Sequence, residues 1–288
     1  MVDLHTHSTA SDGTYRPAEL VRLAESEGLY ALALTDHDTV EGLSEAISAA
    51  REAGLRFVPG VEISVKFEGS GHCHILGYFV DPKNENLRRT LSLLQQAREE
   101  RNVKMVEKLR SLGVEITLEE VAARAGGGEI GRPHFAALLV EKGVVRSPEE
   151  AFERYLRKGA PAYVPKARLS PEEAFSAIRA AGGIAVLAHP VHLRLSPEEL
   201  TRYVARLKEF GLSGIEAYYT DHSPEFTALC LDLSRRFDLV PTGGSDFHGR
   251  NKPDIKLGRG LGNLRVPDEC YDRLYARWER ERAALSLA

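Results

Sequence analysis

Residues 2–8 have the sequence VDLHTHS, in which a short apolar run ends in two histidines separated by one residue. Residues two apart in an extended strand point to the same side, so His5 and His7 can hold one metal ion as a pair. Catalytic residues of a barrel built from alternating strands and helices collect at the carboxyl ends of its strands. The opening segment therefore predicts a strand that carries part of a metal site at its end.

Ionisable residues adjoin other apolar runs in the same way. They are Asp36 and His37 after residues 29–35, Glu62 within 57–64, His74 at the start of 74–80, His189 after 184–188, and Asp246 and His248 after 239–243. One histidine beside a strand is usually structural, but His, Asp or Glu at four or five strand ends predicts a cluster. Imidazole and carboxylate ligands favour Zn, Mn or Fe over Ca. Glu62, with two oxygens, can bridge two ions.

Amphipathic segments between the apolar runs predict helices. These segments cover residues 17–27, 43–53, 171–181, 197–210 and 224–237. Ser170 and Ser196 each precede a proline and two glutamates, which is the expected start of a helix with a serine N-cap and an acidic first turn. A further apolar run, residues 214–219, fits the same alternation. Buried strands alternating with helices predict a parallel α/β architecture.

Residues 85–165 interrupt this alternation. Helical patterns cover residues 85–112, 118–125 and 133–142, with Gly126-Gly127-Gly128 between the second and the third. We therefore expect two domains: a barrel formed by residues 1–84 and 166–288, and a helical insertion, or cap, formed by residues 85–165. The last segment, residues 267–288, predicts a charged terminal helix.

Composition excludes several classes of protein. The 288 residues include 42 acidic and 38 basic side chains, and the formal charge of −4 argues against a broad nucleic-acid-binding coat. Cys73, Cys230 and Cys270 form no C-x-x-C pair, which favours a reducing compartment. No secretory signal pattern and no apolar stretch of about 18 residues is present. We expect a cytoplasmic protein without a membrane span, and the sequence implies no stable protein partner.

Other catalytic templates fit the sequence poorly. It contains neither a G-x-S-x-G nucleophile elbow nor a G-x-x-x-x-G-K-[ST] phosphate loop. Spacing alone does not exclude Ser-His-Asp chemistry, which would leave most strand-end histidines unexplained.

Taken together, these motifs resemble the polymerase and histidinol phosphatase (PHP) superfamily of metal-dependent phosphoesterases. The matching segments, in the family's order, are DLHTHS at 3–8, SDG at 11–13, LTDHD at 34–38, PGVEI at 59–63, HILGY at 74–78, AHP at 188–190 and GSDFH at 244–248. The resemblance spans nearly the whole chain. It implies the α/β class and a distorted, TIM-like (β/α)7 barrel.

The resemblance also implies two or three divalent ions (Mn, Zn or Fe) at three neighbouring positions. The ligands would be His5, His7, Glu62 and Asp246 at the first position, Asp12, His37 and His248 at the second, and Glu62, His74 and His189 at the third. The family motif favours His74 over His72, although both lie on one face of a strand.

Within the superfamily, the chain resembles the nucleoside 3′,5′-bisphosphate phosphatases, a group that includes the 5′–3′ exoribonuclease RNase AM. Two motifs of the insertion carry this narrower match: Arg98-x-x-Arg101-Asn102 and Gly131-Arg132-Pro133-His134. Arg98 and Arg101 are equally consistent with a solvated helix face. Arginine offers bidentate donors to phosphate, and histidine adds a donor or a proton.

The implied reaction removes the 3′-phosphate of a nucleoside 3′,5′-bisphosphate such as adenosine 3′,5′-bisphosphate, or degrades a 5′-phosphorylated short RNA from its 5′ end. Our hypothesis is attack on phosphorus by a metal-bound hydroxide. Arg101, Asn102, Arg132 and His134 would hold the 5′-phosphate. His192 is a candidate general acid, with an ordinary surface histidine as the alternative, and His222 is similarly ambiguous.

Three other functions remain open on the sequence. A histidinol-phosphate phosphatase shares the core, but the insertion argues against it. A polymerase-associated proofreading module is disfavoured because no polymerase-sized extension is present. A non-catalytic phosphate-binding module would have lost some ligands, whereas all nine candidate ligands occur here.

Overall fold

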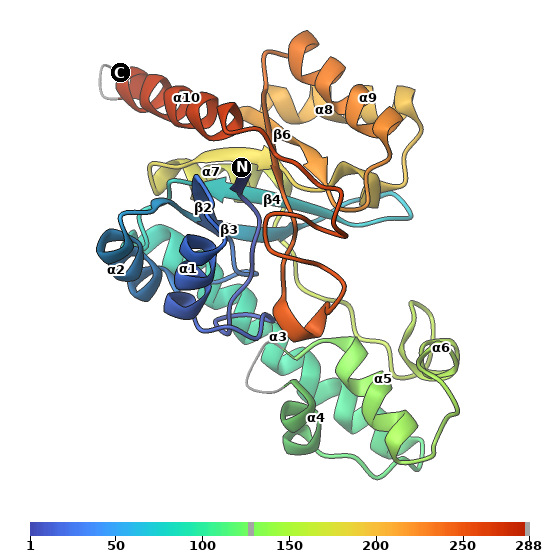
Figure 1. The fold of residues 1–288 in the computed structure, drawn as a ribbon. Coiled ribbons are helices and arrows are strands. Elements are labelled where there is room, and N and C mark those ends of the chain that lie inside the picture. Colours follow the sequence, from blue (N-terminus) through green and yellow to red (C-terminus); the bar gives the residue numbers. More distant parts are fainter. Residues whose placement is uncertain (126–129, 286–288) are drawn as a thin grey trace. The chain divides into compact units, whose positions relative to one another are not determined.

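The computed structural model describes residues 1–125 and 130–285 (Figure 1). Gly126–Gly128 and the end of the helix expected over residues 267–288 fall outside the described residues. The chain divides into two compact units, Met1–Leu91 with Arg168–Ala288 and Ser92–Ala167.

A seven-stranded sheet forms the centre of the larger unit, and its strands pair in chain order. The strands are β1 (Val2–Asp3), β2 (Ala31–Leu34), β3 (Arg56–Val65), β4 (Cys73–Tyr78), β5 (Ile184–Leu187), β6 (Leu212–Tyr219) and β7 (Val240–Gly244). The amide of Leu4 donates to the carbonyl of Gly243 at 3.0 Å, which joins the first strand to the last. The sheet is thus a nearly closed barrel, and the predicted α/β barrel is confirmed.

Strand β4 corrects the expectation of a purely parallel sheet, because it runs antiparallel to both β3 and β5. Residues 66–72 join β3 to β4 and contain no helix. A connection this short reverses the chain, whereas a parallel crossover needs a dozen or more residues. The first residues of β4 therefore lie at the edge where the parallel strands end.

Helices in the larger unit follow the predicted segments. They are α1 (Pro17–Ser26), α2 (Leu43–Ala53), α7 (Pro171–Ala180), α8 (Pro197–Glu209), α9 (Pro224–Arg236) and α10 (Glu269–Leu285), with 3-10 turns η2 (Pro190–Leu193) and η3 (Gly249–Asn251). Ser170 Oγ accepts from the amide of Glu173 at 3.2 Å, and the Glu173 carboxylate accepts from the amide of Ser170 at 2.6 Å. Ser196 and Glu199 form the same pair, so both predicted N-caps are confirmed.

Apolar strand residues form the core of the barrel. Leu4, Leu76 and Val186 are fully buried in one cluster, and each contributes roughly 1.5–3 kcal/mol by leaving water. The Tyr78 hydroxyl donates to the carbonyl of Leu4 at 2.7 Å. Gly244 allows the closest approach, because a Cβ atom there would lie 2.4 Å from the backbone nitrogen of His5. This packing sets the strand end that carries the first histidine pair.

The smaller unit has a hydrophobic core of its own, which includes Met105, Leu109, Phe135 and Leu139. Its elements are most of α3 (Glu85–Ser111), α4 (Leu118–Ala125), α5 (Arg132–Glu141), α6 (Pro148–Ala151) and the π-helical turn η1 (Phe152–Leu156). Helix α3 begins in the larger unit and continues in the smaller one, because the boundary falls after Leu91.

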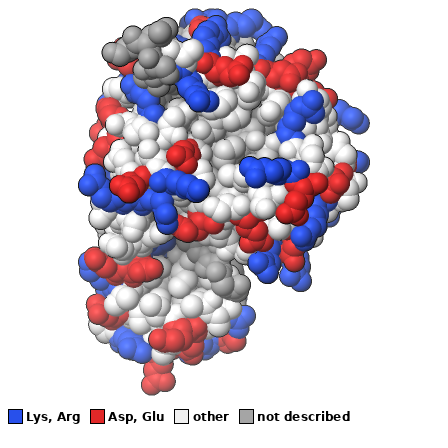
Figure 2. All heavy atoms as spheres, turned by 90° about the vertical axis from the view of Figure 1, so that its left-hand side faces the viewer, with Lys and Arg blue, Asp and Glu red and all other residues white. Residues whose placement is uncertain are grey.

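Surface charge is mixed on the face shown in Figure 2, where Lys and Arg are interspersed with Asp and Glu. None of the helices in the described part of the chain combines the length and apolarity that a membrane crossing requires. Cys73, Cys230 and Cys270 are buried and free.

Candidate metal centre

The barrel brings the nine predicted metal ligands together at one edge. Six of them follow strands directly or by a short loop: His5, His7, His37, His189, Asp246 and His248. Glu62 lies within β3 and His74 is the second residue of the antiparallel β4, whose direction brings it to this edge. The remaining residue, Asp12, comes from the loop between β1 and α1.

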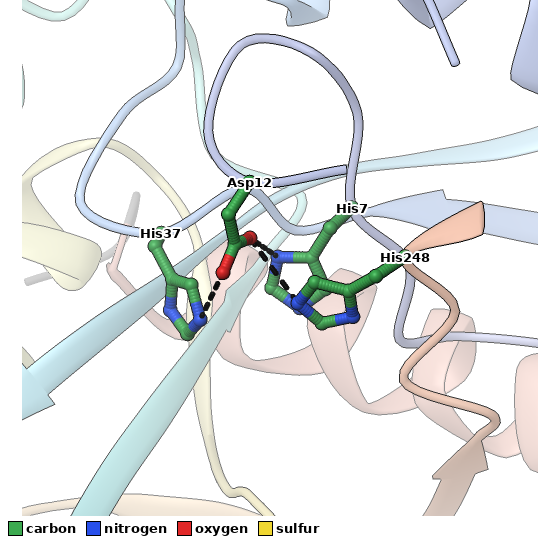
Figure 3. A group of neighbouring side chains, drawn as sticks. All are labelled: His7, Asp12, His37 and His248. Atoms are coloured by element: carbon green, nitrogen blue, oxygen red, sulfur yellow. Dashed lines mark ion pairs between the residues drawn. The ribbon is translucent and has the colours of Figure 1, made fainter. Parts of the chain in front are cut away.

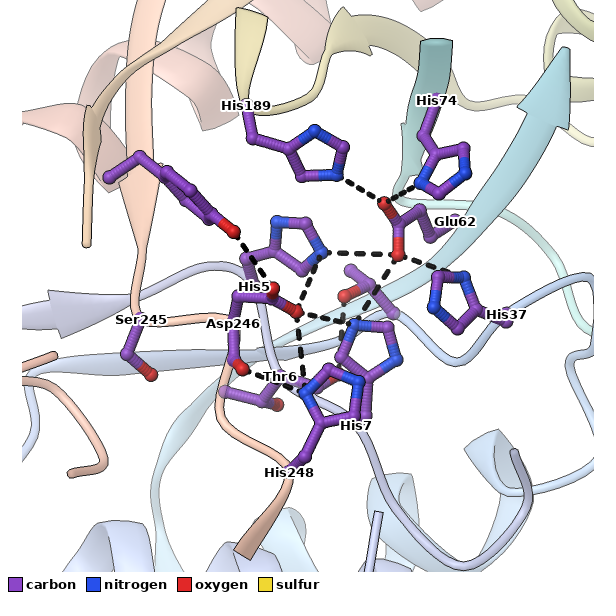
Figure 4. A network of polar contacts seen from close by, with 12 residues as sticks. His5, Thr6, His7, His37, Glu62, His74, His189, Ser245, Asp246 and His248 are labelled. Atoms are coloured by element: carbon purple, nitrogen blue, oxygen red, sulfur yellow. Dashed lines mark hydrogen bonds and ion pairs between the residues drawn. The ribbon is translucent and has the colours of Figure 1, made fainter. Parts of the chain in front are cut away.

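Glu62 lies at the centre of the cluster, with its two oxygens directed to different neighbours (Figure 4). Oε1 lies 2.7 Å from His74 Nδ1 and 2.8 Å from His189 Nε2. Oε2 lies 3.0 Å from His37 Nδ1, 3.3 Å from His5 Nε2 and 3.4 Å from His7 Nε2. This arrangement suits a carboxylate that bridges two cations.

Asp246 completes the group around the first histidine pair. Its Oδ1 lies 3.2 Å from His7 Nε2 and 3.8 Å from His5 Nε2. His5, His7 and Asp246 thus offer ligand atoms close enough to share one ion.

A second group surrounds Asp12 (Figure 3). Its Oδ1 lies 3.1 Å from His248 Nε2, and its Oδ2 lies 3.8 Å from His37 Nε2. The ring of His7 also borders this group, with Nδ1 at 3.6 Å from Asp12 Oδ1. His7 therefore lies between the first and second groups.

Buried polar atoms at these positions test whether the residues fit metal ions. His5 Nε2, His7 Nδ1, His7 Nε2 and Glu62 Oε2 are buried and have no hydrogen-bond partner among the described residues. A buried polar atom without a partner costs free energy, and such atoms need an explanation in a native fold. Imidazole nitrogens and carboxylate oxygens converging in this way fit divalent transition-metal ions.

Electrostatic effects shift the protonation of these groups in different directions. Burial opposes a charge on Glu62, yet His37 and His74 outweigh it and hold the pKa of Glu62 well below its usual value. Burial, strengthened by His248, lowers the pKa of His7 to about 3. Burial acts the same way on His5, but Glu216 and Glu62 raise the pKa of His5 overall. The site thus combines an ionised carboxylate with an imidazole that stays neutral at pH 7.

Glu216, on β6, is a residue of the candidate site that the sequence reasoning missed. It is fully buried, and its Oε1 lies 3.1 Å from His5 Nδ1. Its Oε2 accepts from the backbone amide of His189 at 2.6 Å. A carboxylate on the far nitrogen of a ligand imidazole sets its tautomer and orientation. The sequence did contain one indication of this role, namely a glutamate inside an apolar strand pattern. A charge buried in a strand requires partners.

We expect Glu216→Ala to weaken metal binding by about 10–100-fold, the usual cost of losing such a carboxylate. The substitution frees the His5 ring and leaves the amide of His189 without its acceptor. Equilibrium dialysis in chelator-buffered Mn²⁺ or Zn²⁺, followed by metal analysis, measures the effect. Glu209→Ala, at an exposed position of α8, is the matched control. Unchanged metal affinity in a folded Glu216→Ala protein would contradict this role.

Two more buried carboxylates hold the loops that carry ligands. Asp3 accepts from the amides of His5, Ser245 and Gly258 and from the Ser245 hydroxyl, and burial raises the pKa of Asp3 to about 6. Asp36, from the predicted LTDHD motif, accepts from both Ser8 and Ser11 at distances of 2.6–2.7 Å. These carboxylates face the protein backbone and hydroxyls, so they act as supports for the ligand loops.

Tyr219 and Lys252 hold the outer oxygen of Asp246, and neither was singled out from the sequence. The Tyr219 hydroxyl donates to Asp246 Oδ2 at 2.9 Å, and Lys252 Nζ lies 2.6 Å from the same atom. Oδ1 stays directed toward His5 and His7. Lys252 lies six residues after Asp246 in a loop, so no strand or helix periodicity indicated that the two side chains meet.

A cavity of about 270 Å³ opens beside the cluster, and its lining includes His74, His189, His192 and Lys252. His192 Nε2 lies 3.2 Å from the Tyr219 hydroxyl. Burial, together with His189, lowers the pKa of His192. His192 therefore has a position at the cavity but favours the neutral form.

His72 and His222 are not among the nine predicted ligands, although His72 forms a possible metal-binding group with His189 and His192. The ring of His72 stacks on that of His192 with centroids 5.0 Å apart, at the cavity wall. His222 directs Nδ1 to the carbonyl of Ala217 at 2.9 Å.

The two predicted phosphate-binding motifs lie beside each other within the smaller unit. Arg98, Arg101 and Asn102 are buried residues of α3, and Asn102 Nδ2 donates to the carbonyl of Ile130 at 3.4 Å. Arg101 Nη1 donates to Asn102 Oδ1 at 3.1 Å.

Arg132 and His134 occupy the first turn of α5. Arg132 Nη1 donates to the carbonyl of Leu156 at 3.3 Å, and its guanidinium lies 5.5 Å from the ring centroid of Tyr163. His134 Nδ1 accepts from the amide of Gly131 at 3.0 Å.

Comparison with known proteins places the chain in a family. A family model described as PHP domain matches residues 3–159. A 5′–3′ exoribonuclease of Haemophilus influenzae is 37% identical over 246 residues, which cover 85% of this chain and 89% of the relative. A 3′,5′-nucleoside bisphosphate phosphatase of Chromobacterium violaceum is 36% identical over 93% of both chains.

A solved structure from Bifidobacterium adolescentis, assigned provisionally as a metal-dependent phosphoesterase, has a TM-score of 0.79 and 35% identity over 96% of both chains. The agreement therefore covers the barrel fold as well as the sequence. The matched family segment contains six of the nine predicted ligands: His5, His7, Asp12, His37, Glu62 and His74. On these grounds the chain belongs to the PHP family.

Proposed function

We propose that this protein is a phosphoesterase that removes the 3′-phosphate of nucleoside 3′,5′-bisphosphates. The proposal includes 5′-phosphorylated short RNA as a second substrate, degraded from its 5′ end. Relatives named for each activity are 36–37% identical to this chain over most of its length. The observation that carries the proposal is the carboxylate of Glu62, whose Oε1 faces two imidazoles and whose Oε2 faces three.

We further propose two or three resident ions of Mn, Zn or Fe at these groups. His5, His7, Glu62 and Asp246 would hold the first, Asp12, His37 and His248 the second, and Glu62, His74 and His189 the third. Bound divalent ions activate water and neutralise the charge of a phosphoryl group.

We assign the substrate contacts to the protein's own side chains. His192 is our proposal for protonating the leaving 3′ oxygen, since it lines the cavity and contacts Tyr219. Its lowered pKa means that it must gain a proton when the anionic substrate binds. Arg98, Arg101, Asn102, Arg132 and His134 are our proposal for binding the 5′-phosphate, because guanidinium, amide and imidazole groups all donate to phosphate oxygens.

A phosphate-release screen tests the proposed function. Its substrates are adenosine 3′,5′-bisphosphate, histidinol phosphate and a 5′-phosphorylated RNA oligonucleotide, with a metal-only control. We expect the bisphosphate and the RNA to be turned over, and histidinol phosphate to be a poor substrate. Preference for histidinol phosphate would favour the alternative phosphatase, and no turnover of any substrate would favour a non-catalytic binding module.

Arg132→Ala tests the selectivity that we assign to the insertion. A charge-assisted contact contributes about 1.5–3 kcal/mol, so kcat/KM for adenosine 3′,5′-bisphosphate should fall about 10–100-fold. Turnover of an aryl phosphate, which has no second phosphate, should change little. Arg146→Ala, at an exposed site of the same unit, provides the control. Equal losses on both substrates would remove Arg132 from phosphate recognition.

A further inference from the structure

Among the residues that the structure describes, one Lys or Arg side chain lines the cavity beside the metal centre. It is Lys252, which follows the 3-10 turn η3 in the loop after His248. The other ionisable groups in the lining are imidazoles, carboxylates and the Tyr219 phenol. An ammonium group beside clustered metal ligands repels any cation bound there. Some other contact must therefore favour a lysine at this position.

Lys252 forms an ion pair with Asp246, which explains one of the contacts of its ammonium group. Lys252 Nζ lies 2.6 Å from Asp246 Oδ2, the oxygen that also accepts from the Tyr219 hydroxyl. Asp246 Oδ1, by contrast, faces His7 Nε2 at 3.2 Å (Figure 4). Tyr219 is thus already in place to orient the carboxylate, so this task does not require a lysine.

The ammonium retains donors beyond that ion pair. A lysine has three N–H donors, and one contact to Asp246 uses one of them. The side chain is 43% exposed, and it lines the cavity.

We propose that Lys252 binds a non-bridging oxygen of the phosphoryl group at the metal centre. The ligand class is a terminal phosphate monoester or inorganic phosphate, and the proposal rests on the phosphoesterase function above. The phosphate offers the remaining N–H donors a full negative charge. Lys252 then belongs to the substrate-binding residues and is separate from the proposed 5′-phosphate contacts of the insertion.

Inorganic phosphate is the probe for this proposal, because it lacks the nucleoside and the second phosphate. Its affinity for the metal-loaded protein is measured by calorimetry, and metal content is measured on the same samples. We expect Lys252→Met to weaken phosphate binding about 10–100-fold, the cost of one hydrogen bond to a charged group. Metal content should stay at the wild-type level because Tyr219 still holds Asp246. Lys252→Arg should recover most of the phosphate affinity.

Lys256→Met is the matched control, because Lys256 lies four residues away and its Nζ donates to the carbonyl of Pro253. Phosphate affinity should be unchanged in this control. Wild-type phosphate affinity in metal-replete Lys252→Met would overturn the proposal. Loss of metal in Lys252→Met would also overturn it, and would show that the lysine only supports Asp246. Failure of the proposed function is a separate result, namely no turnover of the bisphosphate by the wild-type protein.

Discussion

Glu62→Gln is expected to lower metal content and reduce kcat/KM by more than about 100-fold. Losing a residue that only orients a metal ligand costs at most about 100-fold in metal affinity or activity. Glu62 is a proposed ligand itself, so its loss should cost more. The substitution preserves the shape of the side chain but replaces an anionic oxygen by an NH₂ group, which cannot coordinate a metal ion. Because Oε1 of Glu62 faces two imidazoles and Oε2 faces three, the change affects more than one of the three groups.

Metal analysis of the purified variant, paired with phosphate release from adenosine 3′,5′-bisphosphate, measures the effect. Glu25→Gln, at an exposed position of α1, carries the same change of charge away from the centre and should behave as wild type. A Glu62→Gln protein with wild-type metal content and turnover would show that Glu62 is not a bridging ligand.

Removing the metal ions should abolish phosphate release and also lower thermal stability. Buried imidazole and carboxylate atoms without hydrogen-bond partners are tolerated when a cation fills the space between them. Ions that bind only the folded protein stabilise it by about 2.7 kcal/mol at 100 times Kd. Their loss should therefore lower the Tm by roughly 5 °C or more.

Dialysis against a chelator, followed by calorimetry and an activity assay, tests this expectation. Adding Mn²⁺, Zn²⁺ or Fe²⁺ back should restore both the Tm and the turnover, and the most effective ion identifies the preferred metal. A control sample is dialysed in parallel against the same buffer without chelator. Full activity in protein with no detectable metal would refute the metal-dependent mechanism.

Local patterns carried most of the prediction of the candidate site. His5 and His7 were recognised because side chains two apart on a strand share a face. The serine caps of α7 and α8 were equally local signals. Residues that depend on distant partners were missed: Glu216 was hidden in an apolar strand, and Lys252 had no motif.

The direction of β4 shows the same limit in the fold. An apolar strand looks the same in either direction, so the predicted strand over residues 74–80 carried no information about orientation. The short 66–72 connection was the available clue, because it leaves no room for a crossover helix. Only this reversal explains why His74, at the start of its strand, joins residues that follow the ends of others.

The sequence by itself determined the alternation of strands and helices and the kinds of groups that end the strands, because strand and helix periods are local properties of the chain. The barrel class came from the resemblance to the PHP superfamily. The tertiary structure decided which atoms meet: Glu62 Oε1 faces His74 and His189, while Oε2 faces His5, His7 and His37. It also decided that Glu216 orients His5 and that Lys252 borders the cavity. These contacts join residues far apart in the chain, so they depend on strand register and on the near closure of the barrel, which no local pattern encodes.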